Sequence, residues 1–269
     1  MSTLLVASLL ASCGSSDGVT SGTSTKTPPV TIGYSANADD AIVRIGAPGW
    51  LPSLVIGGDG WAYQPSGDAA DWTSPESMRP PVRPLSLGGS LRPAVAPAPP
   101  QPTPVQRRLL TPSGMQIVLA LADELDLLAV PDVYQDPGVT DSGSTFVRLS
   151  VAAGTFEHVA YALGFDDEVG NRRNLERFVD AVGDLETLVG ADNIGPAEAY
   201  VPAVFAVSMY NGYSFDDEIT WPDRVPVEQG CVALPVDRFP FGVAGLYTAE
   251  VDGSPARVSV LPDLPGDDC

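Results

Sequence analysis

The sequence predicts an α+β fold in which mainly antiparallel sheet is covered on one face by two principal helices. Strand-like segments follow one another mostly as pairs joined by short glycine-containing turns, which favours antiparallel pairing. Two other segments repeat apolar residues at three- and four-residue steps, as amphipathic helices do. With 269 residues and 44% hydrophobic residues, the chain is long enough to bury a core as one large or two small domains.

The first elements of the predicted body are strands. The β-branched residues at 41–45 predict one strand, and the apolar runs 54–56 and 61–63 predict a hairpin. The turn between them, Gly57-Gly58-Asp59-Gly60, supplies residues that accept positive φ. Residues 75–107 are dense in proline, which excludes a helix or a central strand. We expect a polyproline-like connector there, with a partner-docking segment of the PxxP kind as the alternative.

The middle of the chain predicts a helix followed by a second hairpin. Thr111 can cap the first amides of a helix, and Pro112 is tolerated at its first position. Apolar residues then recur at helical spacing until Pro131 ends the helix. Alternating residues at 145–151 and 156–161 predict two strands of a hairpin.

A second helix is predicted to start near Asn171 and to end at Gly190, with one continuous apolar face. The chain after it predicts more antiparallel sheet. We expect these strands at residues 200–209, around 231–234, and in a hairpin of 246–251 with 256–261.

The N-terminus has the pattern of a lipoprotein signal. Residues 4–11 are apolar but too few to cross about 30 Å of hydrocarbon as a helix, and they are typical of a signal-peptide core. Leu10-Ala11-Ser12-Cys13 matches a bacterial lipobox, so we expect cleavage between Ser12 and Cys13. The thiol of Cys13 would then carry diacylglycerol and its amine an acyl chain such as palmitate, which is enough for stable anchoring. A chance cysteine in an ordinary secretory signal is the alternative.

These patterns divide the chain into three parts. Residues 1–12 are the predicted signal peptide, and residues 13–37, rich in Ser, Thr and Gly, are a predicted disordered tether. Residues 38–269 are the predicted α+β body, with two subdomains, 38–165 and 166–269, as the alternative division.

The remaining two cysteines are candidates for a disulfide bond if the protein lies outside the cytoplasm. Once Cys13 is acylated, Cys231 and Cys269 are left, and an oxidising exterior allows them to pair. Such a bridge would close a loop of about forty residues and stabilise the fold by about 3–4 kcal/mol in the chain-entropy model. Two free thiols are the alternative, because the sequence does not show the separation of the two Cα atoms.

Composition argues against several functions. The chain has 34 acidic and 14 basic residues and a formal net charge of -20, so we expect no nucleic-acid partner. One histidine and three cysteines leave little material for a zinc or iron–sulfur site, and we expect no cofactor and no metal. Acidic clusters that could attract calcium lack an EF-hand pattern, and we expect solvated turns at 39–40, 166–168, 216–218 and 267–268.

The candidate functional side chains are few. His158 lies in a predicted strand on the face opposite Glu157 and Val159, and no G-x-S-x-G motif accompanies it. No catalytic residue is therefore assigned. Trp50, Trp61 and Trp72 lie near turns and could form a ligand-binding aromatic face, with capping of a small core as the alternative.

The chain resembles a group of secreted actinobacterial lipoproteins to which no activity is assigned. Residues 41–163 also resemble a small domain of unknown function with a strand, a Gly-Asp-Gly hairpin, a helix and a closing hairpin. The resemblance implies fold and location but no catalytic residue. It rests on the lipobox, Gly58-Asp59-Gly60, Leu110-Thr111, Thr140-Asp141 with Thr145, the helix 178–188, Ala199-Tyr200-Val201-Pro202, Trp221-Pro222 and the tail 261–269.

From these observations we expect a lipid-anchored protein of the cell envelope, on the outer face of the cytoplasmic membrane. Its partners would be the membrane, through acylated Cys13, and an unknown envelope partner or ligand bound by a non-enzymatic body. One alternative is an extracellular hydrolase or metal-dependent enzyme that uses His158 or the acidic turns. Another is a structural spacer without a pocket.

Overall fold

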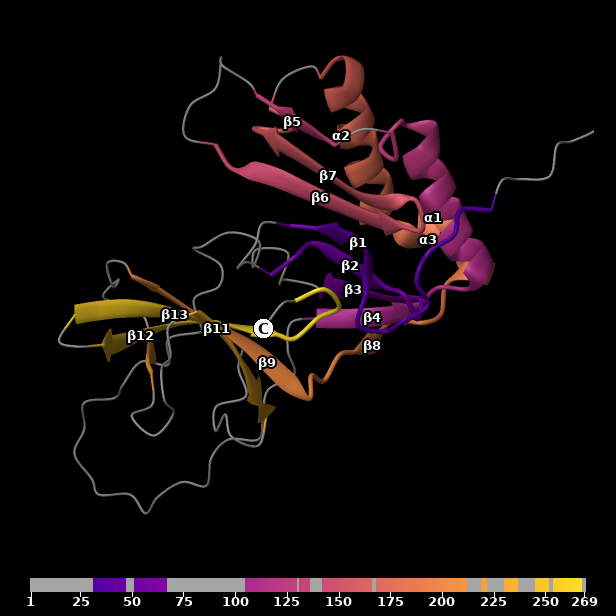
Figure 1. Ribbon diagram of the computed structural model, residues 1–269. Helices are drawn as coiled ribbons and strands as arrows, with labels where there is room; N and C mark the ends of the chain where they lie inside the picture. The colour runs from indigo at the N-terminus through magenta and orange to yellow at the C-terminus, as the bar shows by residue number, and fades with distance from the viewer. Residues whose placement is uncertain are drawn as a thin grey trace, which may run out of the picture. The chain divides into compact units, whose positions relative to one another are not determined.

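The α+β fold predicted from the sequence is confirmed, with antiparallel sheet and helices in the expected order (Figure 1). The structure is a computed structural model. It describes residues 31–46, 51–66, 105–129, 131–135, 142–165, 168–211, 219–221, 230–236, 245–251 and 254–267.

The larger sheet has eight strands in the order β5-β7-β6-β1-β2-β3-β4-β8, and only the β5–β7 pair is parallel. The first predicted strand thus lies in the middle, between two hairpins that are far apart in the sequence. The strands are β1 (Ala41–Ile45), β2 (Leu54–Gly57), β3 (Trp61–Pro65), β4 (Val105–Leu109), β5 (Asp132–Tyr134), β6 (Ser144–Val151), β7 (Gly154–Tyr161) and β8 (Glu198–Ala199).

Three helices cover one face of this sheet: α1 (Pro112–Glu124), α2 (Gly170–Gly183) and α3 (Leu185–Val189) (Figure 1). The predicted start of α1 is confirmed, because the Thr111 hydroxyl accepts a hydrogen bond from the Gly114 N–H at 3.1 Å. The second predicted helix is interrupted. Asp184 leaves the helical conformation and its side chain accepts the Thr187 N–H, so it caps a new helix, α3, which ends before Gly190.

The main core lies between these helices and the sheet. Its buried side chains come from β1, β2, β6 and β7 on one side and from all three helices on the other. The largest of them include Ile42, Ile56, Leu119, Leu149 and Phe178, each at most 1% exposed. The apolar residues at helical spacing in α1 and α2 therefore bury one face of each helix, as the sequence pattern predicted.

The smaller sheet has five strands in the order β10-β12-β13-β9-β11. It has its own core of Phe205, Tyr247, Val258 and Val260, against which Trp221 is buried. The β12–β13 hairpin predicted from the sequence is confirmed. The strands are β9 (Val204–Asn211), β10 (Ile219–Thr220), β11 (Gly230–Pro235), β12 (Gly245–Val251) and β13 (Ser254–Pro262).

Two predicted boundaries are wrong. The tether was expected to extend to residue 37, but Ile32 exchanges two hydrogen bonds with the Gln116 side chain of α1, and Ile32 and Tyr34 pack against the core. The body therefore includes residues from 31 onward. The proline-rich connector was expected to extend to residue 107, but β4 begins at Val105 and pairs with β3. The signal peptide and the rest of both segments lie outside the described residues.

The alternative division at residue 165 does not follow the sheets. Helices α2 and α3 and strand β8 come after that position, yet they pack on or extend the eight-stranded sheet. Residues 31–269 belong to one unit in their contacts.

The packing of α2 on the sheet predicts the effect of a core truncation. Phe178→Ala should lower the free energy of unfolding by about 3–5 kcal/mol, because a fully buried aromatic ring leaves a cavity. Urea denaturation measures this. The control is Arg177→Ala at the exposed neighbouring position, which should change stability by less than about 0.5 kcal/mol. Similar small effects of both substitutions would contradict the docking of α2.

Candidate functional site

The face of the larger sheet opposite the helices carries a row of charged side chains. The row is set by strand register: Arg44 of β1 lies opposite Arg148 of β6, which lies opposite Glu157 of β7. On the other side of β1, the residues at the same level of the sheet are first the buried Val55 and Tyr63. The next two are charged, Arg107 and Glu198.

Arg148 and Arg44 each form an ion pair with an acidic residue. The Arg148 Nε atom lies 3.1 Å from Glu157 Oε1, in a pair whose side chains are 44% and 61% exposed. The Arg44 Nη2 atom lies 2.6 Å from Asp267 Oδ1, in a pair that is 13% and 17% exposed. The order of charges is therefore acid, base, base, acid, with the two arginines as neighbours in register.

Asp267 reaches this row because the chain after β13 turns back over the sheet. Leu264 is buried among residues of the sheet face, including Ala41 and Val55. The Gly266 N–H donates to the Asp39 carbonyl at 2.9 Å. Gly266 has a φ of 75° and a Cβ there would lie 2.7 Å from the Ala41 Cβ, so this position favours glycine. We call residues 263–267 the C-terminal turn.

The C-terminal turn also gathers negative charge. Burial, together with the neighbouring carboxylates of Asp267 and Asp39, raises the pKa of Asp263. Arg44 is the cation that faces this turn, since it also donates from Nη1 to the Pro265 carbonyl at 3.3 Å. The positive charge of Arg44 thus offsets the negative charge of the C-terminal turn on the sheet.

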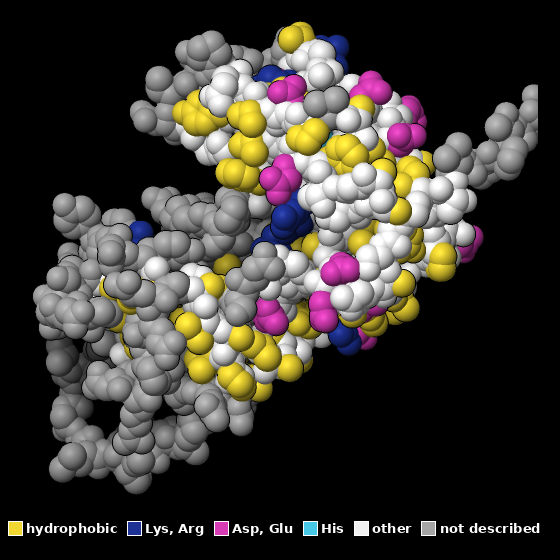
Figure 2. All heavy atoms as spheres, in the orientation of Figure 1, with side chains coloured by type: hydrophobic (Ala, Val, Ile, Leu, Met, Phe, Trp, Pro, Cys, Tyr) yellow, Lys and Arg dark blue, Asp and Glu magenta, His cyan; other side chains and the backbone are white. Residues whose placement is uncertain are grey.

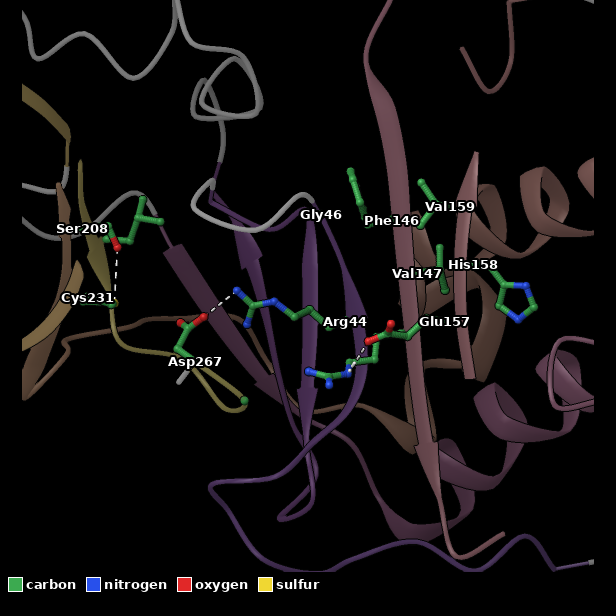
Figure 3. Close-up of a pocket in the computed structure, with 14 residues that line it drawn as sticks. Arg44, Gly46, Phe146, Val147, Glu157, His158, Val159, Ser208, Cys231 and Asp267 are labelled. Carbon is green, nitrogen blue, oxygen red and sulfur yellow. Dashed lines mark hydrogen bonds and ion pairs between the residues drawn. The ribbon is translucent and has the colours of Figure 1, made fainter. Parts of the chain in front are cut away.

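A cavity of about 470 Å³ lies between the charged row and the smaller sheet. Basic and acidic side chains gather in a hollow of the surface in Figure 2. Figure 3 shows the Arg44 side chain pointing towards Asp267 across this space. The lining combines the four charged residues with polar Ser208 and Cys231 and with apolar Phe146, Val159, Ala206 and Leu261.

The His158 ring lies on the other side of β7, towards the helices (Figure 3). The residue is 1% exposed. Its Nε2 atom lies 2.9 Å from the Leu127 carbonyl and its Nδ1 atom 3.3 Å from the Tyr134 hydroxyl. Because a carbonyl only accepts, Nε2 carries a proton, and the Tyr134 hydroxyl can donate to Nδ1. The predicted placement opposite Glu157 and Val159 is confirmed. His158 is among the residues that line the cavity, but its ring points away from it, towards the helices.

The acidic turns do not assemble a cation site in the described part of the chain. No group of three or more His, Cys, Asp or Glu side chains there could hold a metal ion. Glu168 is buried and makes a two-point ion pair with Arg172, at 2.5 Å from Nε and 2.7 Å from Nη2. Asp166, Asp167, the cluster 216–218 and Asp268 lie outside the described residues.

The predicted tryptophan face lies mostly outside the described residues. Only Trp61 of the three is described, and Trp50 and Trp72 lie outside the described residues. The Arg107 guanidinium lies over the Trp61 ring at 4.3 Å, and the same arginine pairs with Glu198 at 2.7 Å. Trp61 therefore packs against β4 and β8, which fits the alternative of an aromatic residue covering a small core.

Of the three cysteines, only Cys231 lies within the described residues. Cys231 lies in β11 and lines the cavity together with Asp267, which is two residues before Cys269. Cys13, Ser12 and Cys269 lie outside the described residues. Acylation of Cys13 and pairing of Cys231 with Cys269 stay predictions.

Arg44 and Arg148 are the site residues that sequence reasoning missed. Each is a single charged residue inside an apolar strand, Ala-Ile-Val-Arg-Ile and Phe-Val-Arg-Leu. That pattern is a usable signal, because a lone arginine among alternating core residues must point to the opposite face. What it does not show is that the two strands are neighbours in register.

The comparisons with known proteins identify no relative. No family model, no curated protein and no solved structure matches the chain. Among the described residues, no helix combines the length and the apolar character needed to cross a membrane.

The buried Glu168–Arg172 pair predicts a pH-dependent contribution to stability. Hydrogen bonds from Arg172 and from the Gly164 N–H lower the pKa of Glu168. A carboxyl with a lowered pKa stabilises the fold above its ordinary value of about 4.3 and loses this contribution as pH falls through the folded-state value. Glu168→Gln should therefore lower the unfolding free energy by about 3 kcal/mol at pH 7, as measured by urea denaturation.

The difference between wild type and Glu168→Gln should shrink when the same measurement is repeated below about pH 4. The matched control is Glu157→Gln, which breaks an exposed ion pair and should cost less than about 1 kcal/mol. A Glu168→Gln deficit that is unchanged in acid would contradict the charged pair.

Proposed function

We propose that this protein is a lipid-anchored component of the cell envelope, on the outer face of the cytoplasmic membrane, and that its body is a non-enzymatic binding module. The observation that carries the binding role is the cavity between the charged row and the smaller sheet. Its volume of about 470 Å³ falls within the range of small-molecule sites, about 300–1,000 Å³. Its lining offers apolar surface and a few charged groups, which is the composition that such sites use.

The position of His158 favours binding over hydrolysis. A hydrolase that depended on this histidine would need the ring beside a nucleophile in a cleft. Here the ring contacts Leu127 and Tyr134 on the helix side of the sheet. The alternative of an extracellular hydrolase or metal-dependent enzyme therefore loses the residue on which it mainly depended.

The lipobox at residues 10–13 supports the anchor. If acylated Cys13 begins the mature chain, residues 14–30 connect it to the body. Because this connection is covalent, the body would remain attached to the membrane surface. A cavity on such a body faces molecules outside the cytoplasmic membrane.

The anchor predicts a specific modification. The wild-type chain expressed in its native host should sediment with membranes and show an intact mass increased by the lipid at Cys13. Cys13→Ala should lose both the added mass and the membrane association, because the acyl chains are the proposed attachment. Ser16→Ala, just outside the lipobox, is the control and should behave as wild type.

A wild-type chain that is soluble and carries no lipid would overturn the proposed location. It would leave the cavity as a candidate ligand site, since the two parts of the proposal depend on different residues.

A further inference from the structure

We infer that the cavity binds an oxyanion, a carboxylate or phosphate group, between the guanidinium groups of Arg44 and Arg148, on a ligand whose apolar portion lies against Phe146 and Val159. This inference rests on the proposed function, because it assigns a ligand class to the same cavity.

The two arginines are held side by side by the sheet. They are direct partners across the β1–β6 pair, and like charges at such positions repel one another. Each guanidinium has an acidic partner, but Glu157 and Asp267 stand at the two ends of the row. The centre of the row is therefore positive, and an oxyanion placed there would reduce the repulsion between both arginines at once.

Arg148 has N–H donors that can bind an oxyanion. A guanidinium has five N–H donors. Within the described part of the chain, the contact of Arg148 with an acidic group is the ion pair of Nε with Glu157, which leaves its terminal nitrogens available to a ligand. Arginine forms two parallel hydrogen bonds with carboxylates and phosphates, so the side chain suits this ligand class.

The competing interaction is weak. The Arg148–Glu157 pair is exposed, and exposed ion pairs contribute little to stability. Arg44 differs, because its pair with Asp267 is mostly buried and fixes the C-terminal turn. We therefore assign Arg148 as the adaptable anion-binding residue and Arg44 as its fixed neighbour.

The surroundings of the row point to a ligand that is not a bare anion. Phe146 and Val159 are partners across the β6–β7 pair and line the same cavity as Arg148. Leu261 and Ala206 add apolar surface from the smaller sheet. An apolar chain or ring attached to the oxyanion would remove this surface from water.

The formal charge of -20 does not oppose this assignment at contact distance. At physiological ionic strength, charges more than about 8 Å away are largely screened. Binding is then decided by the charged groups that line the cavity. These are two arginines, neighbours in register, and the carboxylates of Glu157 and Asp267, each paired with one of them.

The test uses the full chain carrying Cys13→Ala, without detergent, and four probes: octanoate, octyl phosphate, octylamine and inorganic phosphate. Isothermal titration calorimetry at fixed ionic strength gives the affinities. We expect octanoate or octyl phosphate to bind, and octylamine to bind at least about tenfold more weakly. The stronger of the two anionic amphiphiles identifies carboxylate or phosphate as the preferred group, and inorganic phosphate should bind more weakly than octyl phosphate.

Substitutions locate the site. Arg148→Gln should weaken binding of the anionic amphiphile by at least about tenfold, and Arg148→Lys should restore part of it. Glu157→Gln should strengthen binding, because it removes the competing carboxylate. Arg177→Gln, an exposed arginine on α2, is the matched control and should leave binding unchanged. Equal urea midpoints for the Arg148 variants and wild type show that the fold is retained.

Three results would overturn the inference. Preferential binding of octylamine would show that the cavity selects cations rather than anions. The inference would then be wrong, but the proposed binding role would be retained. An Arg148→Gln variant that binds like Arg177→Gln would place the anion elsewhere. Absence of binding by all probes would overturn both the ligand class and the cavity as the binding site, while the anchor would still be judged by membrane fractionation.

Discussion

The ion pair between Arg44 and Asp267 connects the central strand of the larger sheet to the C-terminal turn, 223 residues later in the chain. Among the described residues, Arg44 supplies the positive charge that faces this acidic turn, where burial and the acidic neighbours raise the pKa of Asp263. Leu264 adds apolar contact at the same place. Together they hold the C-terminal turn on the sheet, and Gly266 and Asp267 of this turn line the cavity. The site therefore depends on a contact between the two ends of the body.

The larger sheet separates two kinds of chemistry. On the helix side, His158 and the Glu168–Arg172 pair are buried and have protein partners, which is what stability requires of polar groups away from water. On the other side, Arg148 and Glu157 are exposed and weakly paired. A ligand can exchange with such a pair at little cost, whereas displacing the groups on the helix side would disrupt the core.

Local patterns predicted the start of α1, both hairpins of the larger sheet and most of the other strands, because each depends on neighbouring residues. The strands β4, β5, β8 and β10 were not predicted. The break at Asp184 was missed because the apolar spacing continues through it, although the side chain caps a new helix. The attachment of Ile32 to Gln116 was missed because two hydrogen bonds and a few apolar atoms leave no composition signal. The charged row was missed because Arg44, Arg148 and Asp267 come together only through the register of β1 with β6 and the return of the chain after β13.

The most direct test of this account is amide hydrogen exchange of the C-terminal turn in the wild-type chain and in Arg44→Gln. The amides of Leu264 and Gly266 donate to Asp267 and to the Asp39 carbonyl, so they should exchange slowly in the wild type. Arg44→Gln should accelerate exchange in the turn and leave the amides of α1 unchanged. Fast exchange of the wild-type turn would show that the turn is not held on the sheet and that the cavity is not formed as described. Slow exchange in both chains would contradict the role given to the Arg44–Asp267 ion pair.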